Sequence, residues 1–177
     1  DAALLRRWQF DDALVPLANP LSAELGVMRP GLLPGLVDAL ARNAARQQGR
    51  VRLFELGKVF AAAQAAGEAP RETPRIAAVA TGDAVAEQWG LPARRVDFHD
   101  LKGDLEALAA LSGARLAFRP AAPSWAHPGR AAEVLRDGEE VGAIAELHPR
   151  LLQALDLDQP AVAFELDLAA LTLRPLA

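Results

Sequence analysis

The sequence contains no cysteine. This absence excludes disulfides, a thiol nucleophile and every zinc site that needs a thiolate ligand. No apolar run approaches the roughly 18 residues that a membrane-spanning helix needs. No basic and apolar leader resembles a signal peptide. We therefore predict a cytoplasmic protein with no membrane partner.

Lysine is scarce, and the 19 basic residues are scattered along the sequence. Lys58 and Lys102 are the only lysines, the arginines are dispersed, and the formal net charge is -4. Because RNA phosphates are bound by clustered cations, these features argue against a stand-alone tRNA-binding module. No glycine-rich phosphate-binding motif occurs either.

The length of 177 residues and the 51% hydrophobic content suit a single globular domain over 1–177. The sequence begins with Asp1, and its only methionine is Met28. We therefore expect a fragment of a longer protein.

The hydrophobic pattern predicts more strands than helices. Helical spacing appears over 32–44 and 101–111, and a short helix is expected after His148-Pro149. Strands are expected over 50–60, 76–81, 116–118 and 161–167, with a hairpin over 131–147 around Asp137-Gly138 and loops over 61–75 and 120–129. Gly57 is expected to form a bulge or turn, and Gly49 a left-handed helix cap. Hairpin connections of this kind favour an α+β fold with a mainly antiparallel sheet flanked by helices.

Several residues near 100 carry chemistry. His99 with Asp100 and Asp104 resembles an acid–base group. A more ordinary interpretation is a helix start, in which Asp100 is the cap and Asp104 lies in the first turn. Lys102 has the chemistry of a buried amine nucleophile, but pairing with Glu106 one turn later is the more common role of such a lysine.

His127, His148 and Glu146 form a second group with potential metal ligands. Their spacing matches no metal-binding motif, and both histidines precede a proline. Hydrogen bonds that anchor loops, or contacts with a partner subunit, are the alternatives that we favour.

The remaining candidates are one arginine and the tryptophans. Arg29 stands before the apolar helix and is expected to hold a carboxylate, in its own fold or in a partner. Trp8, Trp89 and Trp125 are candidate interface anchors, and each is equally compatible with a core position. We select Arg29, His127, His148 and Trp125 as residues that face a partner or anchor loops.

Several segments in a shared order resemble one family. They are NPLS (19–22), VMRPGLLPGL (27–36), NAARQQGRVRLFELGKVF (43–60), VDFHDLKGDLE (96–106), HPG (127–129), GEEVGAIAELHP (138–149) and VAFELDLAAL (162–171). Together they resemble the synthetase-like core of bacterial phenylalanyl-tRNA synthetase β subunits. The resemblance implies a class II aminoacyl-tRNA synthetase-like core. It also implies an α-subunit partner in an α2β2 ligase that charges tRNA(Phe) with phenylalanine.

In that family the β core is a non-catalytic copy of the fold. Class II catalytic cores carry an Arg-x-Glu sequence after a strand that resembles 52–60, but Ala61-Ala62-Ala63 stand there in this sequence. The glycine-rich strand and ATP-binding arginine of the third motif are missing from 162–171, where Glu165 and Asp167 would repel phosphates unless a metal ion lay between them. The resemblance therefore implies no catalytic, cofactor-binding or metal-binding residue here. ATP, Mg and the tRNA-binding modules are expected in other parts of the complex.

A second hypothesis is a class II-like core with a divergent adenylate or amino-acid binding site. Such a site needs an arginine near the open face of the sheet. Arg52, Arg119 and Arg130 are the candidates.

Overall fold

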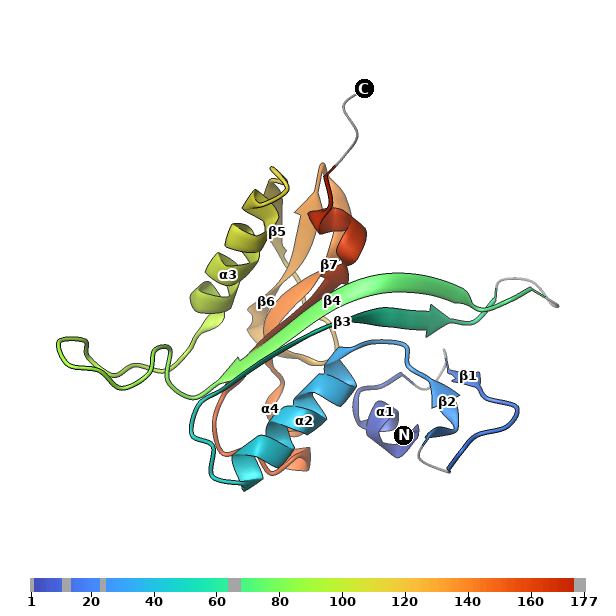
Figure 1. Ribbon diagram of the computed structural model, residues 1–177, viewed down its shortest axis with the longest axis horizontal. Coiled ribbons are helices and arrows are strands. Elements are labelled where there is room, and N and C mark those ends of the chain that lie inside the picture. Colours follow the sequence, from blue (N-terminus) through green and yellow to red (C-terminus); the bar gives the residue numbers. More distant parts are fainter. Residues whose placement is uncertain (1, 11–13, 23–24, 64–67, 174–177) are drawn as a thin grey trace.

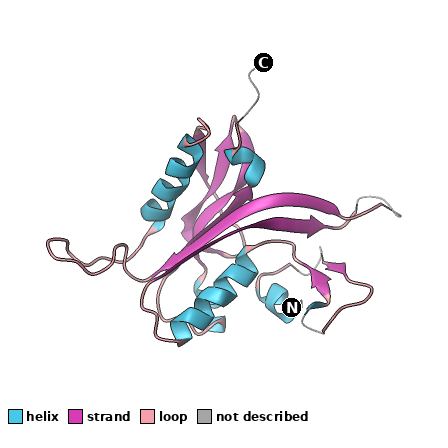
Figure 2. Ribbon diagram, viewed as in Figure 1, coloured by secondary structure: helices cyan, strands magenta, loops and turns pink. Residues whose placement is uncertain are grey.

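The computed structural model describes residues 2–10, 14–22, 25–63 and 68–173. Figure 1 labels the elements in chain order, and Figure 2 separates helices from strands. The helices are α1 (Ala2–Arg7), α2 (Leu33–Ala45), α3 (Phe98–Ala110), α4 (Pro149–Ala154) and the 3-10 helix η2 (Leu168–Leu171). The strands are β1 (Val15–Pro16), β2 (Val27–Met28), β3 (Val51–Ala61), β4 (Arg71–Thr81), β5 (Leu116–Pro120), β6 (Ala126–Arg136), β7 (Glu139–Leu147) and β8 (Ala161–Asp167).

A six-stranded sheet organises the fold. Its strand order is β3-β4-β8-β7-β6-β5, and every neighbouring pair is antiparallel. Strands β1 and β2 form a separate antiparallel pair. The α+β prediction with a mainly antiparallel sheet is therefore confirmed.

Helices α2 and α3 cover opposite faces of this sheet. Side chains of α2 cluster with Ala77 and Val79 of β4, whereas side chains of α3 cluster with Ile76 and Ala80 of the same strand. Because successive side chains of a strand point to opposite faces, the two helices must lie on different sides. Figure 1 shows this arrangement.

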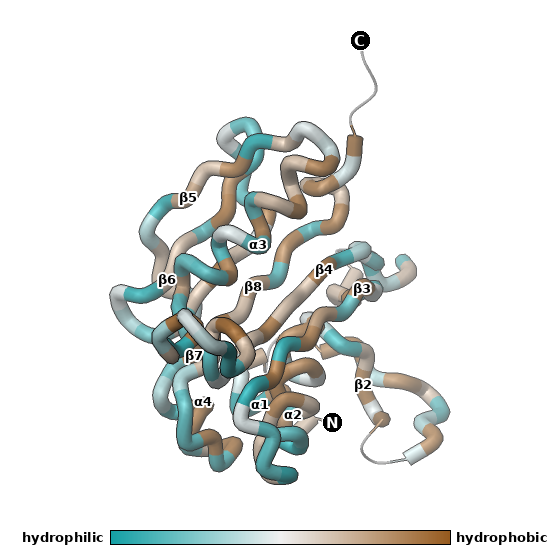
Figure 3. The backbone as a smooth tube through the Cα atoms, turned by 60° about the vertical axis from the view of Figure 1, so that its left-hand side comes forward, coloured by the Kyte–Doolittle hydropathy of each residue, from teal (hydrophilic) through white to brown (hydrophobic). Residues whose placement is uncertain are grey.

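Strand β8 lies between these two helical layers, and its residues from Ala161 to Leu166 are all buried. A strand that is covered on both faces has a continuous apolar sequence rather than an alternating one. Residues 161–166 have such a sequence, with Glu165 as the exception. Figure 3 shows hydrophobic colours along much of β4 and β8. The buried carboxylate of Glu165 therefore needs partners within the fold.

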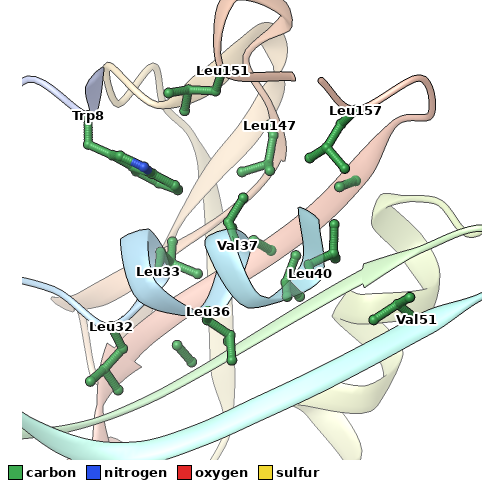
Figure 4. Close-up of a cluster of buried hydrophobic side chains, with 14 of the residues drawn as sticks. Trp8, Leu32, Leu33, Leu36, Val37, Leu40, Val51, Leu147, Leu151 and Leu157 are labelled. Carbon is green, nitrogen blue, oxygen red and sulfur yellow. The ribbon is translucent and has the colours of Figure 1, made fainter. Parts of the chain in front are cut away.

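The core on the α2 face is closed by the N-terminal segment and α4. Trp8 is 1% exposed and packs in the same cluster as Leu33, Val37 and Leu40 of α2. Figure 4 shows the indole beside the start of α2, with Leu147 and other leucines above the helix. Of the three tryptophans, Trp8 thus has a core position.

Strand β4 is longer than its apolar pattern predicts. It begins at Arg71 and pairs with β3 without interruption from Ala61↔Arg71 to Val51↔Thr81. The prediction of a loop over 61–75 is therefore wrong for 61 and 71–75, because the pairing of β3 with β4 extends both strands beyond the apolar pattern. Residues 64–67 of that predicted loop lie outside the described residues. The register is also continuous at Gly57, so no bulge or turn forms there.

The hairpin prediction is confirmed at its turn, where Asp137 and Gly138 have φ values of 56° and 86°. Positive φ at both central residues is the geometry of a type I′ turn. Strand β6 begins at Ala126, earlier than predicted, and its pairing with β7 is irregular between Ala126 and Ala131. The predicted loop over 120–129 is therefore too long at both ends, since β5 extends to Pro120.

Two predicted helix boundaries are corrected by the structure. Asp97, not Asp100, is the N-cap of α3, and Asp100 completes the capping box from the third helical position. After α2, the residue with left-handed backbone is Gln47 with φ 62°, rather than Gly49. At the start of α3 the Asp97 side chain accepts from the N–H groups of His99 and Asp100. At the end of α2 the Gln47 N–H donates to the Ala44 carbonyl.

Candidate functional site

A cavity of about 310 Å³ lies against the α2 face of the sheet. Strands β4, β7 and β8 form one wall, and the start of α2 forms another. Aromatic rings of Trp8, Phe10 and Trp125 line it together with charged side chains at 75, 140, 165 and 167. Because the sheet face, the start of α2 and aromatic rings meet in this cavity, we take it as the candidate ligand-binding site.

Glu165 occupies the N-terminal end of α2. Its side chain is 8% exposed, and Oε2 accepts hydrogen bonds from the backbone N–H groups of Leu32 at 2.9 Å and Leu33 at 3.0 Å. The first N–H groups of a helix have no partner within the helix, and the positive end of the helix dipole favours a carboxylate there. A glutamate 132 residues away along the chain therefore acts as the cap of α2.

Arg75 is the cation of this cavity, and it is held by two carboxylates. Its Nη1 donates a hydrogen bond to Glu165 Oε1 at 3.2 Å, and its Nε lies 3.0 Å from Asp167 Oδ1. Glu140 adds a third carboxylate, and Arg75 is the only lysine or arginine among the described lining residues. The cavity is therefore net negative, which disfavours the phosphates of a nucleotide.

Trp125 and His148 are positioned by contacts within the fold. The rings of Trp8 and Trp125 lie 6.3 Å apart between centroids, and the backbone N–H of His148 donates to the Trp125 carbonyl at 2.8 Å. The Nδ1 atom of His148 accepts from the Arg150 N–H at 3.1 Å and so caps α4. The half-buried Trp125 ring thus forms part of the cavity wall.

Arg29 also binds within the chain. Its guanidinium forms an ion pair with Glu55, and its Nε donates to the Lys58 carbonyl at 2.8 Å. A Cβ atom on Gly57 would lie 2.2 Å from Arg29 Nη2. A Cβ at position 57 would therefore displace the end of the Arg29 side chain from its contacts with Glu55 and Lys58.

The predicted group of His127, Glu146 and His148 does not come together in the structure. Glu146 pairs with Arg130 at 2.7 Å, and the His127 Nδ1 lies 2.7 Å from the carbonyl oxygen of Pro128. His148 caps α4 instead of joining them. Among the described residues, no three histidine, aspartate or glutamate side chains are placed to hold a metal ion.

The group around His99 is also separated by arginines. Asp100 accepts two hydrogen bonds from Arg94, at 2.7 and 2.6 Å, and this contact lowers the pKa of Asp100 to about 2. Asp104 instead pairs with Arg52 at 2.8 Å. The His99 ring packs edge-on against Phe98. Neither carboxylate is therefore placed to orient the imidazole as a base.

Lys102 pairs with Glu106, which is the more common of its two predicted roles. Its ammonium pairs with Glu106 at 2.5 Å and lies 4.5 Å from the centre of the Phe118 ring. These contacts explain the lysine as part of the α3 surface.

The three arginines of the adenylate-binding hypothesis all have carboxylate partners. Arg52 pairs with Asp104, Arg119 with Glu133 and Arg130 with Glu146. The Arg119 guanidinium lowers the pKa of Glu133. None of the three arginines lines the cavity at the start of α2.

Comparison with known proteins decides the family. The family model described as the phenylalanyl tRNA synthetase beta chain CLM domain matches residues 1–168. The chain belongs to this family. The family assignment accounts for the shared order of the segments quoted above.

Similar curated proteins carry the name phenylalanine–tRNA ligase beta subunit. The protein of Xanthomonas axonopodis pv. citri is 64% identical over 176 residues, which cover 99% of this chain and 22% of that protein. The protein of Xylella fastidiosa (strain Temecula1) is 59% identical over the same shares. The chain thus spans about a fifth of the length of the curated relatives that it matches.

The carboxylates of Glu165 and Asp167 were predictable from the sequence, but Arg75, which contacts both, was not. A signal for this contact was present, since one glutamate interrupts an otherwise apolar strand and therefore needs a buried partner. The partner could not be chosen without the β4–β8 register, which sets Arg75 opposite Asp167.

No helix among the described residues has the length and apolar character needed to cross a membrane.

Proposed function

We propose that the chain is the non-catalytic, class II synthetase-like core of a phenylalanyl-tRNA synthetase β subunit. In this role it supports α2β2 assembly with the α subunit for the charging of tRNA(Phe) in the cytoplasm. ATP and Mg bind elsewhere in the complex, and tRNA(Phe) binds through other modules. The contribution of this chain is a folded surface that keeps these parts in register.

The observation that supports the non-catalytic role is the pairing of charges in the cavity at the start of α2. Nucleotide transfer needs fixed cations on the phosphates, because negative charge develops there. In this cavity Arg75 is held by Glu165 and Asp167, and Glu165 also takes the N–H groups at the start of α2. Both features that could bind a phosphate therefore already face carboxylates of the fold.

Strand β3 supports the same conclusion. It resembles the first half of the second class II motif and ends at Ala61, followed by two more alanines. An alanine offers neither the cation nor the carboxylate that the Arg-x-Glu sequence supplies. The cavity and the motif therefore point independently to a core without nucleotide chemistry.

Calorimetric titration tests this absence of binding. The chain is titrated with ATP and with a non-hydrolysable phenylalanyl-adenylate analogue, after a melting transition has shown that it is folded. We expect no heat of binding from either ligand, whereas the α subunit, as the positive control, should bind the analogue. Saturable binding by this chain at micromolar concentrations would establish the divergent-site hypothesis instead.

The assembly role is tested on the full subunits. The β subunit that contains this chain is co-expressed with the α subunit, and the mass of the product is measured by analytical ultracentrifugation. We expect the mass of two α and two β subunits. Separate sedimentation of the two subunits would overturn the assembly role.

A further inference from the structure

The cavity at the start of α2 has an excess of negative charge. The carboxylates of Glu140, Glu165 and Asp167 line it, against the single guanidinium of Arg75. Arg75 donates to Glu165 at 3.2 Å, and this pair is electrically neutral. Glu140 and Asp167 are therefore in excess. A concave site lined by one sign of charge raises the local concentration of ions of the opposite sign, so this cavity attracts cations.

The two carboxylates in excess keep the capacity to accept hydrogen bonds. The Asp167 Oδ1 atom lies 3.0 Å from Arg75 Nε but accepts no hydrogen bond from any described residue. Because the Asp167 side chain is 39% exposed, it can accept from a ligand. Glu140 is exposed, and the neighbouring Arg119 is already paired with Glu133. The fold therefore leaves both carboxylates available to a donor that enters the cavity.

Aromatic rings form the apolar part of the same cavity. Phe10 and Trp125 are half-buried and present ring surface to it, and Trp8 lies behind Trp125 with 6.3 Å between the ring centroids. Figure 4 shows the Trp8 indole beside Leu33 at the start of α2. The face of an aromatic ring attracts an ammonium group within about 6 Å of its centre. Rings and carboxylates together are the combination that binds organic cations.

A glycine keeps one corner of the cavity open. A Cβ atom on Gly31 would lie 3.3 Å and 3.4 Å from the two carboxylate oxygens of Glu165, and 3.6 Å from Cζ of Phe10. Gly31 is not among the residues with positive φ, so the backbone conformation does not require glycine there. The missing side chain therefore leaves space at the point where a ring and a carboxylate meet.

We propose that this cavity binds a small organic cation, a primary ammonium attached to an apolar body. The ammonium faces the carboxylates of Asp167 and Glu165, and the body lies against the rings of Phe10 and Trp125. The volume of about 310 Å³ suits a ligand of this size. The excess negative charge that disfavours a nucleotide favours this ligand, so the inference goes beyond the proposed function and does not depend on it.

Calorimetric titration of the full β subunit with three matched probes tests the ligand class. Benzylamine is protonated at neutral pH, benzyl alcohol has the same ring and size without the charge, and benzoate has the opposite charge. We expect a dissociation constant below about 1 mM for benzylamine. The other two probes should bind at least about tenfold more weakly. Equal affinity for benzyl alcohol, or no binding of benzylamine, would overturn the proposal and leave the proposed function standing.

Substitutions in the full β subunit locate the binding. Gly31→Ala fills the open corner, and its matched control is Gly35→Ala, where a Cβ atom meets nothing within 4 Å. Asp167→Asn removes a charge at constant size, and its control is Asp38→Asn, outside the cavity in α2. We expect Gly31→Ala and Asp167→Asn to weaken benzylamine binding at least about fivefold and the controls to leave it unchanged. Wild-type affinity in both test variants, or an equal loss in the controls, contradicts the site. The melting transition of each variant shows that it is folded.

Two further arms distinguish this ligand from its rivals. L-Phenylalanine carries an added carboxylate and should bind more weakly than benzylamine, because the cavity is net negative. Tighter binding that Gly31→Ala abolishes would establish the divergent amino-acid site and overturn the proposed function as well. In the complex with the α subunit, we expect the same affinity for benzylamine. Loss of binding there would show that the partner fills the cavity and would exclude a small-molecule ligand.

Discussion

Glu165→Ala is the substitution whose effect follows most directly from the structure. It removes the acceptor of the Leu32 and Leu33 N–H groups and one of the two carboxylates that hold Arg75. Leu32 and Leu33 are 1% and 3% exposed, so their N–H groups lose the acceptor inside the fold. Each orphaned buried donor costs about 1–3 kcal/mol. Arg75 is 33% exposed and keeps its contact with Asp167, so the lost ion pair adds at most about 1 kcal/mol. Because these two effects overlap, we expect a loss of about 3–5 kcal/mol in the free energy of unfolding.

Urea denaturation of the chain, followed by circular dichroism, measures this loss. Glu165→Gln keeps a carbonyl oxygen for the helix N–H groups. Its loss in the free energy of unfolding should therefore be at most half of the loss in Glu165→Ala. The matched control is Glu72→Ala, which removes an exposed ion pair with Lys58 and should cost less than about 1 kcal/mol. A loss below about 1 kcal/mol for Glu165→Ala would refute the role of Glu165 as the cap of α2.

Other substitutions test separate parts of the fold. Gly142→Ala should destabilise the chain by more than about 2 kcal/mol in urea denaturation, because a Cβ there would lie 2.2 Å from a backbone oxygen of β8. Gly103→Ala has open space in α3 and should stabilise the chain by up to about 1 kcal/mol; a loss of stability would contradict the described helix. Asp97→Ala should lower the free energy of unfolding by about 1 kcal/mol, and an unchanged value would argue against the capping box. Arg94→Ala should raise the pKa of Asp100 from about 2 toward its ordinary value of 3.8, as followed by NMR titration. Since the folded-state pKa is the lower one, the stability that this pair contributes is present above about pH 4 and is lost as the pH falls toward 2; a wild-type titration curve in the variant would exclude this pair.

The regular elements were predictable where local pattern and tertiary pairing agree. The turn at Asp137-Gly138 needs positive φ at both residues, and this local requirement identified the β6–β7 hairpin. The boundaries of β4 and β6 were wrong because polar residues such as Arg71 enter a strand when a partner strand runs beside them. Strand length in a hairpin is a property of the pair, and apolar patterning in one strand does not report it.

The candidate site was predictable in part. The carboxylates at 165 and 167 were found as groups that repel phosphate, since charge can be judged from residue type alone. Arg75 was missed because it lay in a predicted loop, 90 residues from its partner. The two interpretations of the group at His99 could not be distinguished from the sequence, because the arginines that pair with Asp100 and Asp104 come from outside α3.

The sequence by itself determined the class of fold, the family and the absence of thiol chemistry. These conclusions depend on residue types, periodicity and segment order, which are properties of the chain alone. Tertiary structure decided which charges meet: it set Glu165 against the start of α2 and Arg75, and it left Trp89 in solvent while burying Trp8. The physical reason is that the energy of a charge or an indole depends on its surroundings, and residues far apart in the sequence supply those surroundings.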